Sequence, residues 1–178
     1  VYHTIDLARS QGVRCILNPA PGQPLDLERT RSVDYLIPNE SEAEAISGMA
    51  VENSEDAAAC AAELLDRGLE RVVITLGAQG ALVAGADGTR VVPPFPVEAI
   101  DTTGAGDAFI GSFATFLAEG LSEADALERA SLLFDLLLLP VLGVALIVRH
   151  GTGTMESSPG SICFNKRYNI SALPPVNP

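Results

Sequence analysis

The first 129 residues alternate between β-branched segments and segments with helical periodicity, and this alternation limits the folds that the chain can adopt. Runs rich in Val, Ile and Leu occur at 13–17, 33–37 and 71–76. Helical periodicity occupies 40–47 and 55–67. Strands that alternate with helices at this spacing predict βαβ units. The sequence therefore predicts an α/β fold with a mostly parallel central sheet covered by helices.

Glycines and turn residues mark the ends of these elements. Gly48 and Gly68 follow the two helical segments, where a left-handed C-terminal cap favours glycine. Ser54 is the expected N-cap of the second helix. The segments 81–84 and 89–92, separated by a turn that contains Asp-Gly, predict a hairpin at the edge of the sheet.

Two further helices are expected after Asp101. The first should end near Gly120, and Ser122 with Asp125 three residues later resembles a capping box that starts the second. The apolar stripe of the first helix consists of Phe109, Phe113, Phe116 and Leu117.

Residues 132–148 are almost wholly apolar, but Asp135, Pro140 and Gly143 interrupt them. A membrane-spanning helix needs about 17 or more apolar residues, and an acidic residue within such a helix is costly. We expect a buried helix followed by an irregular tail, with a membrane-anchored protein as the alternative. The chain thus divides into residues 1–131 and a divergent apolar and irregular tail at 132–178.

The charge of the chain disfavours polyanionic partners. Its net charge is −12, it has no Trp, and aromatic residues make up 5%, so nucleic acid and anionic membranes are poor partners. A small anion such as ATP can still be held by backbone N–H groups and a divalent metal. The three cysteines (Cys15, Cys60 and Cys163) lack metal-ligand spacing, and we expect thiols in a reducing cytosol instead of a disulfide or zinc site.

The segment Gly104-Ala105-Gly106-Asp107 has the composition of a phosphate-binding helix start. Glycines allow close approach of the backbone, and the first N–H groups of a helix attract an anion. A carboxylate at Asp107 would not hold a phosphate, but it could accept a proton from an attacking hydroxyl. The ordinary alternative is a tight turn with Asp complementing the helix dipole.

Three other segments offer polar groups near predicted strand ends. Asn39-Glu40-Ser41-Glu42 follows a strand, where open α/β sheets bind ligands, although Asn is also a common N-cap. Thr75-Leu76-Gly77-Ala78-Gln79-Gly80 provides glycines beside a nucleotide or a plain turn. Asp101 and Thr103 provide oxygens for a hard cation or an Asx-type turn.

Together these segments resemble the ribokinase family of carbohydrate kinases. The matching motifs are Asn-x-x-Glu at 39–42, Thr-Leu-Gly-x-x-Gly at 75–80 and Asp-Thr-x-Gly-Ala-Gly-Asp at 101–107. Leu-Asn-Pro-Ala-Pro at 17–21 is similar to the ribokinase branch more than to the fructokinase or adenosine kinase branches. The resemblance covers residues 1–131 and implies a three-layer sandwich, here truncated at its N-terminus, whereas 132–178 do not match the family pattern.

The resemblance also implies a role for each motif. Asp107 resembles the catalytic base, and the N–H groups of Gly104, Ala105 and Gly106 resemble an anion hole for the transferring phosphoryl group. Asn39 and Glu42 resemble residues that organise the phosphates of ATP and the water shell of Mg²⁺. Two further sets complete the implied site: Thr75, Gly77, Ala78, Gln79 and Gly80 as the nucleotide wall, and Asp101 with Thr103 as ligands of K⁺.

The implied activity is transfer of the γ-phosphoryl group of ATP to the primary hydroxyl of a pentose, D-ribose above all. We also expect a cytoplasmic enzyme, and leave the oligomeric state open, with a homodimer of the full-length protein as one alternative. Two alternatives stay open, namely a kinase for another sugar or a nucleoside, and a truncated nucleotide-binding module without catalytic activity.

Overall fold

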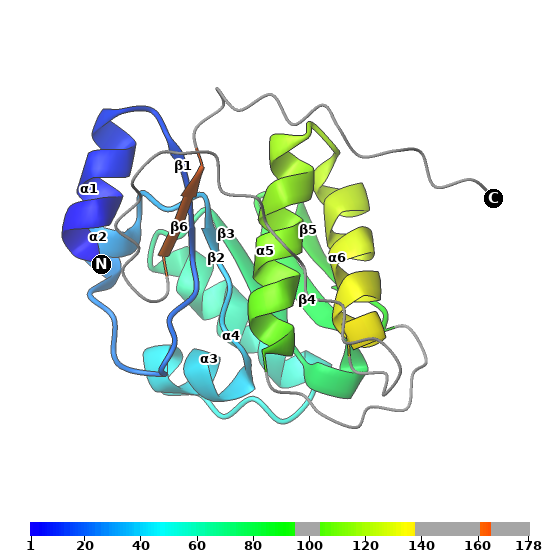
Figure 1. The fold of residues 1–178 in the computed structure, drawn as a ribbon. Helices are drawn as coiled ribbons and strands as arrows, with labels where there is room; N and C mark the ends of the chain where they lie inside the picture. The colour runs from blue at the N-terminus through cyan, green and yellow to red at the C-terminus, as the bar shows by residue number, and fades with distance from the viewer. Residues whose placement is uncertain (95–103, 138–160, 165–178) are drawn as a thin grey trace.

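The computed structural model describes residues 1–94, 104–137 and 161–164 (Figure 1). The elements follow one another as α1 (Tyr2–Ser10), β1 (Arg14–Leu17), α2 (Leu27–Thr30), β2 (Tyr35–Leu36), α3 (Glu40–Ser47), α4 (Ser54–Asp66), β3 (Arg71–Thr75), the 3₁₀ turn η1 (Gly77–Gln79), β4 (Ala81–Gly85), β5 (Gly88–Val92), α5 (Ala105–Ala118), α6 (Glu123–Leu137) and β6 (Ser161–Phe164).

The strands form one sheet in the order β5-β4-β3-β2-β1-β6. β1, β2 and β3 are parallel, as the βαβ pattern predicts. β4 and β5 form the predicted antiparallel hairpin, in which β4 also pairs antiparallel with β3 and β5 lies at the edge. β6 pairs antiparallel with β1 on the other side. The α/β class is confirmed, and the sheet as a whole is mixed, with its parallel part at the centre.

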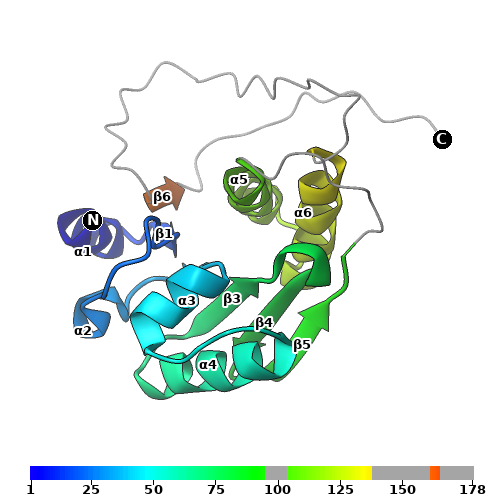
Figure 2. The ribbon, with the colours of Figure 1, turned by 90° about the horizontal axis from the view of Figure 1, so that it is seen from below.

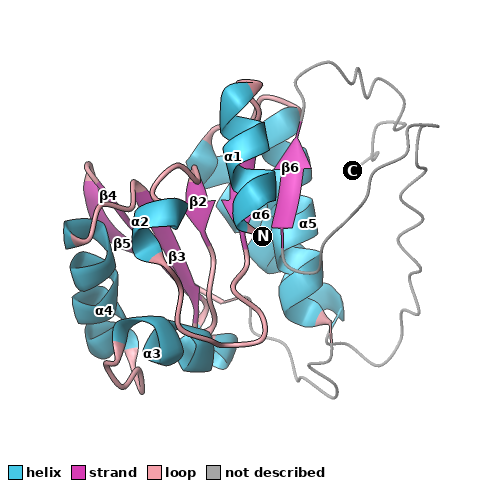
Figure 3. Ribbon diagram, turned by 90° about the vertical axis from the view of Figure 1, so that its left-hand side faces the viewer, coloured by secondary structure: helices cyan, strands magenta, loops and turns pink. Residues whose placement is uncertain are grey.

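Helices cover both faces of this sheet because successive strand residues point to opposite sides. Leu17 packs into one core with residues of α1, α3 and α4. Its neighbour Ile16 packs into a second core with residues of α5 and α6. Figure 2 shows α5 and α6 on one side of the sheet and α4 on the other, and Figure 3 shows the same three layers from the side.

The helix ends follow the expected caps except at one position. Gly48 and Gly68 have φ angles of 80° and 100°, so both adopt the positive φ for which glycine is suited. The N-cap of α4 is Asn53 and not Ser54, which is a correction of the sequence prediction. The Asn53 side chain accepts from the N–H groups of Glu55 and Asp56 at 2.9 and 3.0 Å, so Ser54 is the first helical residue.

The helices α5 and α6 use the apolar stripe and the N-terminal cap that the sequence predicts. Phe109 and Phe113 are buried, and the Phe113 ring lies edge-on against Tyr35 of β2 with centroids 5.1 Å apart. Ser122 Oγ accepts from the Asp125 N–H at 3.1 Å, which confirms the cap of α6.

The helix α6 continues to Leu137, so the apolar run begins as helix. Residues 138–160 and 165–178 lie outside the described residues. Within the described ranges, no helix has both the length and the apolar character needed to cross a membrane.

Candidate active site

Asn39 and Glu42 form the first turn of α3, immediately beyond the end of β2. The Asn39 side chain accepts from the Glu42 N–H at 2.9 Å, and Glu42 Oε2 accepts from the Asn39 N–H at 2.9 Å. This is a reciprocal capping box, so both residues stabilise the N-terminus of α3 in the ordinary way. Glu42 is nevertheless a carboxylate that is only 7% exposed, and burial of such a group is costly without hydrogen bonds.

Thr75 is the last residue of β3 and lies beside the start of α3. Its N–H donates to the Pro38 carbonyl at 3.0 Å, and Asn39 and Thr75 form a parallel bridge. The segment that follows is η1, in which Gly77, Ala78 and Gln79 are exposed. The carboxyl ends of β2 and β3 therefore bring Asn39 and Thr75 together.

Gly80 ends this turn for a conformational reason. Its φ is 87°, and a Cβ there would lie 2.2 Å from the Val92 carbonyl oxygen and 2.8 Å from the Pro94 nitrogen. The end of β5 passes so close to position 80 that only glycine fits there, whether or not a nucleotide binds nearby.

Gly104 and Asp107 lie at the start of α5, which packs on the other core. Gly104 is the N-cap with a φ of 79°, and within the described part of the chain no side chain caps this helix end. Among the described residues, the first N–H groups of α5 therefore have no side-chain acceptor at the cap, which suits an anion site. A Cβ at Gly106 would meet no described atom within 4 Å. Asp107, in the first turn, is exposed beside this open space.

A cavity of about 160 Å³ joins these segments. It lies at the end of the sheet where α3 begins, and α3 is at the bottom of Figure 1. It contains six of the predicted site residues, drawn from three separate motifs. Its lining consists of Asn18, Ala20, Ile37, Asn39, Glu42, Thr75, Gly104, Gly106, Asp107 and Ile110.

The remaining predicted residues lie elsewhere or cannot be placed. Ala105 is the first residue of α5, between two glycines that line the cavity. The turn of Gly77, Ala78, Gln79 and Gly80 is absent from the lining. Asp101 and Thr103 lie outside the described residues. Asn18 was not among the predicted site residues, although its place directly after a predicted strand was a usable signal.

The side-chain oxygens around the cavity are suitable ligands for a hydrated hard cation. Glu42 and Asp107 provide carboxylates, and Asn18 and Asn39 provide carboxamides, so oxygen is the available ligand type. Neither Lys nor Arg is among the lining residues that the structure describes. Within the described part of the chain, no three His, Cys, Asp or Glu side chains cluster as a metal site. Mg²⁺ held by phosphate oxygens and water, with one or two carboxylates, fits this composition.

A larger cavity, of about 680 Å³, lies at the opposite end of the strands. Among its lining residues, Arg71 donates to both Asp87 and Glu123, and Glu123 also accepts from Arg90, which lies outside the lining, at 3.2 Å. Burial, followed by the charge of Glu123, raises the pKa of Tyr35 to about 12. Tyr35 donates to Glu123 Oε2 at 3.1 Å. These paired groups hold α6 against the sheet. The larger volume of this cavity therefore does not make it the better candidate for the active site.

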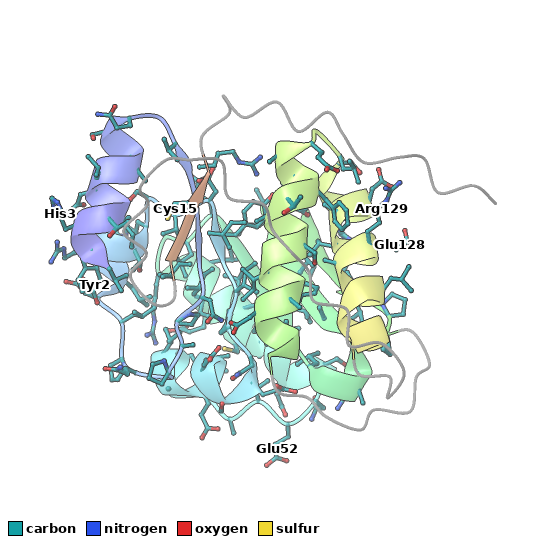
Figure 4. All side chains as sticks on the ribbon, in the orientation of Figure 1. Tyr2, His3, Cys15, Glu52, Glu128 and Arg129 are labelled. Atoms are coloured by element: carbon teal, nitrogen blue, oxygen red, sulfur yellow. The ribbon has the colours of Figure 1, made fainter. Side chains whose placement is uncertain are left out.

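His3, the histidine in the described part of the chain, is exposed on α1, and Figure 4 shows it on the outer side of that helix. It does not line the 160 Å³ cavity. The chemical groups available at the candidate site are therefore carboxylates, amides, a hydroxyl and backbone N–H groups.

Comparison with known proteins gives consistent matches. Residues 1–133 match the family described as pfkB family carbohydrate kinase. A deoxyribokinase of Salmonella typhi is 37% identical over 172 residues, which are 96% of this chain and 53% of that protein. A ribokinase of Haemophilus influenzae is 43% identical over 122 residues, 68% of this chain and 40% of that protein.

A solved structure of Arabidopsis thaliana ribokinase complexed with ribose and ATP has a TM-score of 0.72 and 28% identity. The superposition covers 77% of this chain and 45% of that one. The chain thus spans about half the length of the relatives it matches. The alignment with the deoxyribokinase spans 172 residues, so it extends past residue 132.

Proposed function

The chain belongs to the pfkB family of carbohydrate kinases, and on this premise we propose that it is the phosphoryl-transfer part of an ATP-dependent sugar kinase. The proposed reaction transfers the γ-phosphoryl group of ATP to the primary hydroxyl of a pentose, with D-ribose giving ribose 5-phosphate. The observation that carries the proposal is the shared cavity of Asn39, Glu42, Gly106 and Asp107. Phosphoryl transfer depends mainly on positioning and charge stabilisation, which these groups can provide.

Asp107 is the proposed catalytic base. Its carboxylate accepts the proton of the sugar hydroxyl, whose oxygen forms the new bond to the γ-phosphorus while the bond to the β–γ bridging oxygen breaks and ADP leaves. The N–H groups of Gly104, Ala105 and Gly106 form the proposed anion hole for the transferring group. Gly104 supports this role because, as a glycine in the αL conformation, it begins the helix without a side chain of its own that could occupy these N–H groups.

Asn39 and Glu42 are proposed to position the phosphates and the hydrated metal. When bound, Mg²⁺ supplies positive charge that offsets the charge of the phosphate oxygens. The capping box keeps the Glu42 carboxylate and the Asn39 amide in fixed positions at this end of α3. Thr75 borders the cavity, and the exposed turn of Gly77, Ala78, Gln79 and Gly80 that follows is the proposed nucleotide wall.

Asp101 and Thr103 are proposed to bind an activating K⁺ through their side-chain oxygens. The support is their place in the chain, since they directly precede the Gly104 helix start. A cation there would tune the backbone of the anion hole without contacting the substrate. K⁺ is expected to raise turnover of the full-length protein, and Asp101→Ala is expected to remove that response. Equal rates in K⁺, Na⁺ and cation-free buffer would contradict this proposal.

2-Deoxy-D-ribose is the second candidate substrate, because a deoxyribokinase is among the relatives and its alignment covers 96% of the chain. The two sugars differ only at the 2-hydroxyl, so kcat/KM for each gives the discrimination directly. The test is ADP release by the full-length protein with D-ribose, 2-deoxy-D-ribose and fructose. Turnover of neither pentose, with ATP binding intact, would favour a nucleotide-binding module without catalytic activity.

A further inference from the structure

Asn18 is a neutral side chain in the cavity that has no role in the function proposed above. It follows β1, and its Nδ2 donates to the Ile37 carbonyl at 2.9 Å and to Glu42 Oε2 at 3.5 Å. Ile37 lies just beyond β2, and Glu42 lies in the first turn of α3. One amide group therefore connects the ends of two strands to a buried carboxylate.

The orientation of this amide is fixed by its partners. A carbonyl oxygen can only accept, so the amide atom 2.9 Å from the Ile37 oxygen must be the nitrogen. The Ile37 N–H donates in turn to the Leu17 carbonyl at 2.8 Å, which keeps the two strand ends side by side. With one N–H on Ile37, the second N–H of the amide is available to Glu42.

Glu42 needs such a donor because it is a carboxylate that is largely removed from water. The Asn39 N–H reaches Oε2 at 2.9 Å, and Asn18 reaches the same oxygen over the longer distance of 3.5 Å. Among the described residues, Oε1 receives no such bond. The two donors thus hold the carboxylate by one oxygen, and the other oxygen is left for a ligand.

We propose that Asn18 is a positioning residue that orients the Glu42 carboxylate toward the hydrated metal of the bound nucleotide. The inference rests on the proposed function. A neutral amide suits this task, since Lys or Arg would neutralise the carboxylate and a second carboxylate would repel it. Groups that hold a metal-binding carboxylate in place commonly change metal affinity when they are replaced.

The test measures metal binding without turnover. Mn²⁺ is titrated into the full-length protein with a non-hydrolysable ATP analogue, and free Mn²⁺ is followed by electron paramagnetic resonance. Asn18→Ala is expected to weaken Mn²⁺ binding about tenfold, at the lower end of the range for such residues. Glu42→Gln is expected to weaken it at least as much. Because Asn18 acts through Glu42, the double variant should bind no more weakly than Glu42→Gln alone.

Asn53→Ala is the matched control, because Asn53 caps α4 and is not among the residues that line the cavity. It should lower the melting temperature as a lost cap does and leave Mn²⁺ affinity unchanged. If Asn18→Ala does not fold, Asn18→Ser serves in its place, since a hydroxyl has one donor for Ile37 and none for Glu42.

Unchanged Mn²⁺ affinity in the Asn18 variant would overturn the inference, as would a further loss in the double variant, which would mean that Asn18 acts independently of Glu42. A wild-type protein that binds no Mn²⁺ with the nucleotide analogue would instead overturn the proposed function, and this inference with it.

Discussion

Asp107 occupies the first turn of α5 beside N–H groups that suit an anion, and this placement gives the carboxylate a specific test. Asp107→Asn keeps the shape of the side chain and the helix start, so ATP affinity should stay near the wild-type value. Loss of the base should lower kcat about 10²- to 10⁴-fold. Steady-state kinetics and nucleotide titration on the full-length protein measure the two effects separately.

Asp125→Asn is the control for this change, because Asp125 also lies in the first turn of a helix, α6, where it pairs with Ser122. Its kcat should match the wild-type value. An Asp107→Asn protein that turns over at a near wild-type rate would remove Asp107 as the base.

Gly80 carries a stability prediction that is independent of function. An alanine at φ 87° costs about 1–2 kcal/mol for the left-handed conformation. The overlap of its Cβ with the Val92 carbonyl adds about 1–3 kcal/mol. Gly48→Ala is the control, since Gly48 has a φ of 80° but a Cβ added there would meet no described atom within 4 Å.

Urea unfolding should therefore show a larger decrease in the free energy of unfolding for Gly80→Ala than for Gly48→Ala. Equal decreases for the two variants would mean that the end of β5 can move away from the added Cβ without lowering the free energy of unfolding. The residue types at 77–80 suggested a nucleotide wall. Glycine is also required at position 80 for a structural reason, because the end of β5 passes too close to leave room for a Cβ.

At the scale of elements, α6 is tied to the sheet by Tyr35 and Arg71 through Glu123. Because the pKa of Tyr35 is raised to about 12, the folded state favours the neutral phenol. The resulting stability is fully present below about pH 10, the ordinary value for tyrosine, and is lost as the pH rises toward 12. Tyr35→Phe removes the titrating group, so it should show a shallower fall in unfolding free energy between these pH values.

Tyr2→Phe is the matched control, since the Tyr2 hydroxyl accepts from the Asp26 N–H at 2.9 Å on the opposite side of the sheet core. Its alkaline stability profile should parallel that of the wild type. Identical slopes for Tyr35→Phe and wild type would show that the phenol does not contribute to alkaline unfolding.

Local patterns predicted the longer helices and the strands β1 to β5, but neither α2 nor β6. Contacts between elements were the harder part. Gly48 marked the end of α3 because a positive φ is a local requirement. Ser54 was wrong as a cap because Asn53, one residue earlier, reaches two N–H groups. Asn18 was missed because its contact with Glu42 depends on the register of β1 against β2, which no local pattern contains.

The candidate site lies between the two hydrophobic cores. Asn39, Glu42 and Thr75 come from elements around one side of the sheet, whereas Gly104 and Asp107 come from the helix pair on the other. The cavity lies where these layers meet at the carboxyl ends of the parallel strands. This is the general position of ligands in open α/β sheets, so the parallel βαβ pattern by itself favours a candidate site at this end of the strands.

The chain matches only part of the length of its relatives, and this limits the activity expected of the 178-residue polypeptide. Holding both reactants in place can account for about 7–11 kcal/mol of barrier reduction, and this chain matches only 40% of the Haemophilus influenzae ribokinase. The groups around the cavity suit phosphates and a metal, and among the described residues only Asp107 has a proposed contact with the sugar. The 178-residue polypeptide is therefore expected to bind an ATP analogue but not to phosphorylate ribose. A coupled ADP-release assay beside that ribokinase measures this, with nucleotide titration as the control for folding. Sugar-dependent turnover within about tenfold of the relative would show that the essential sugar contacts lie within this chain.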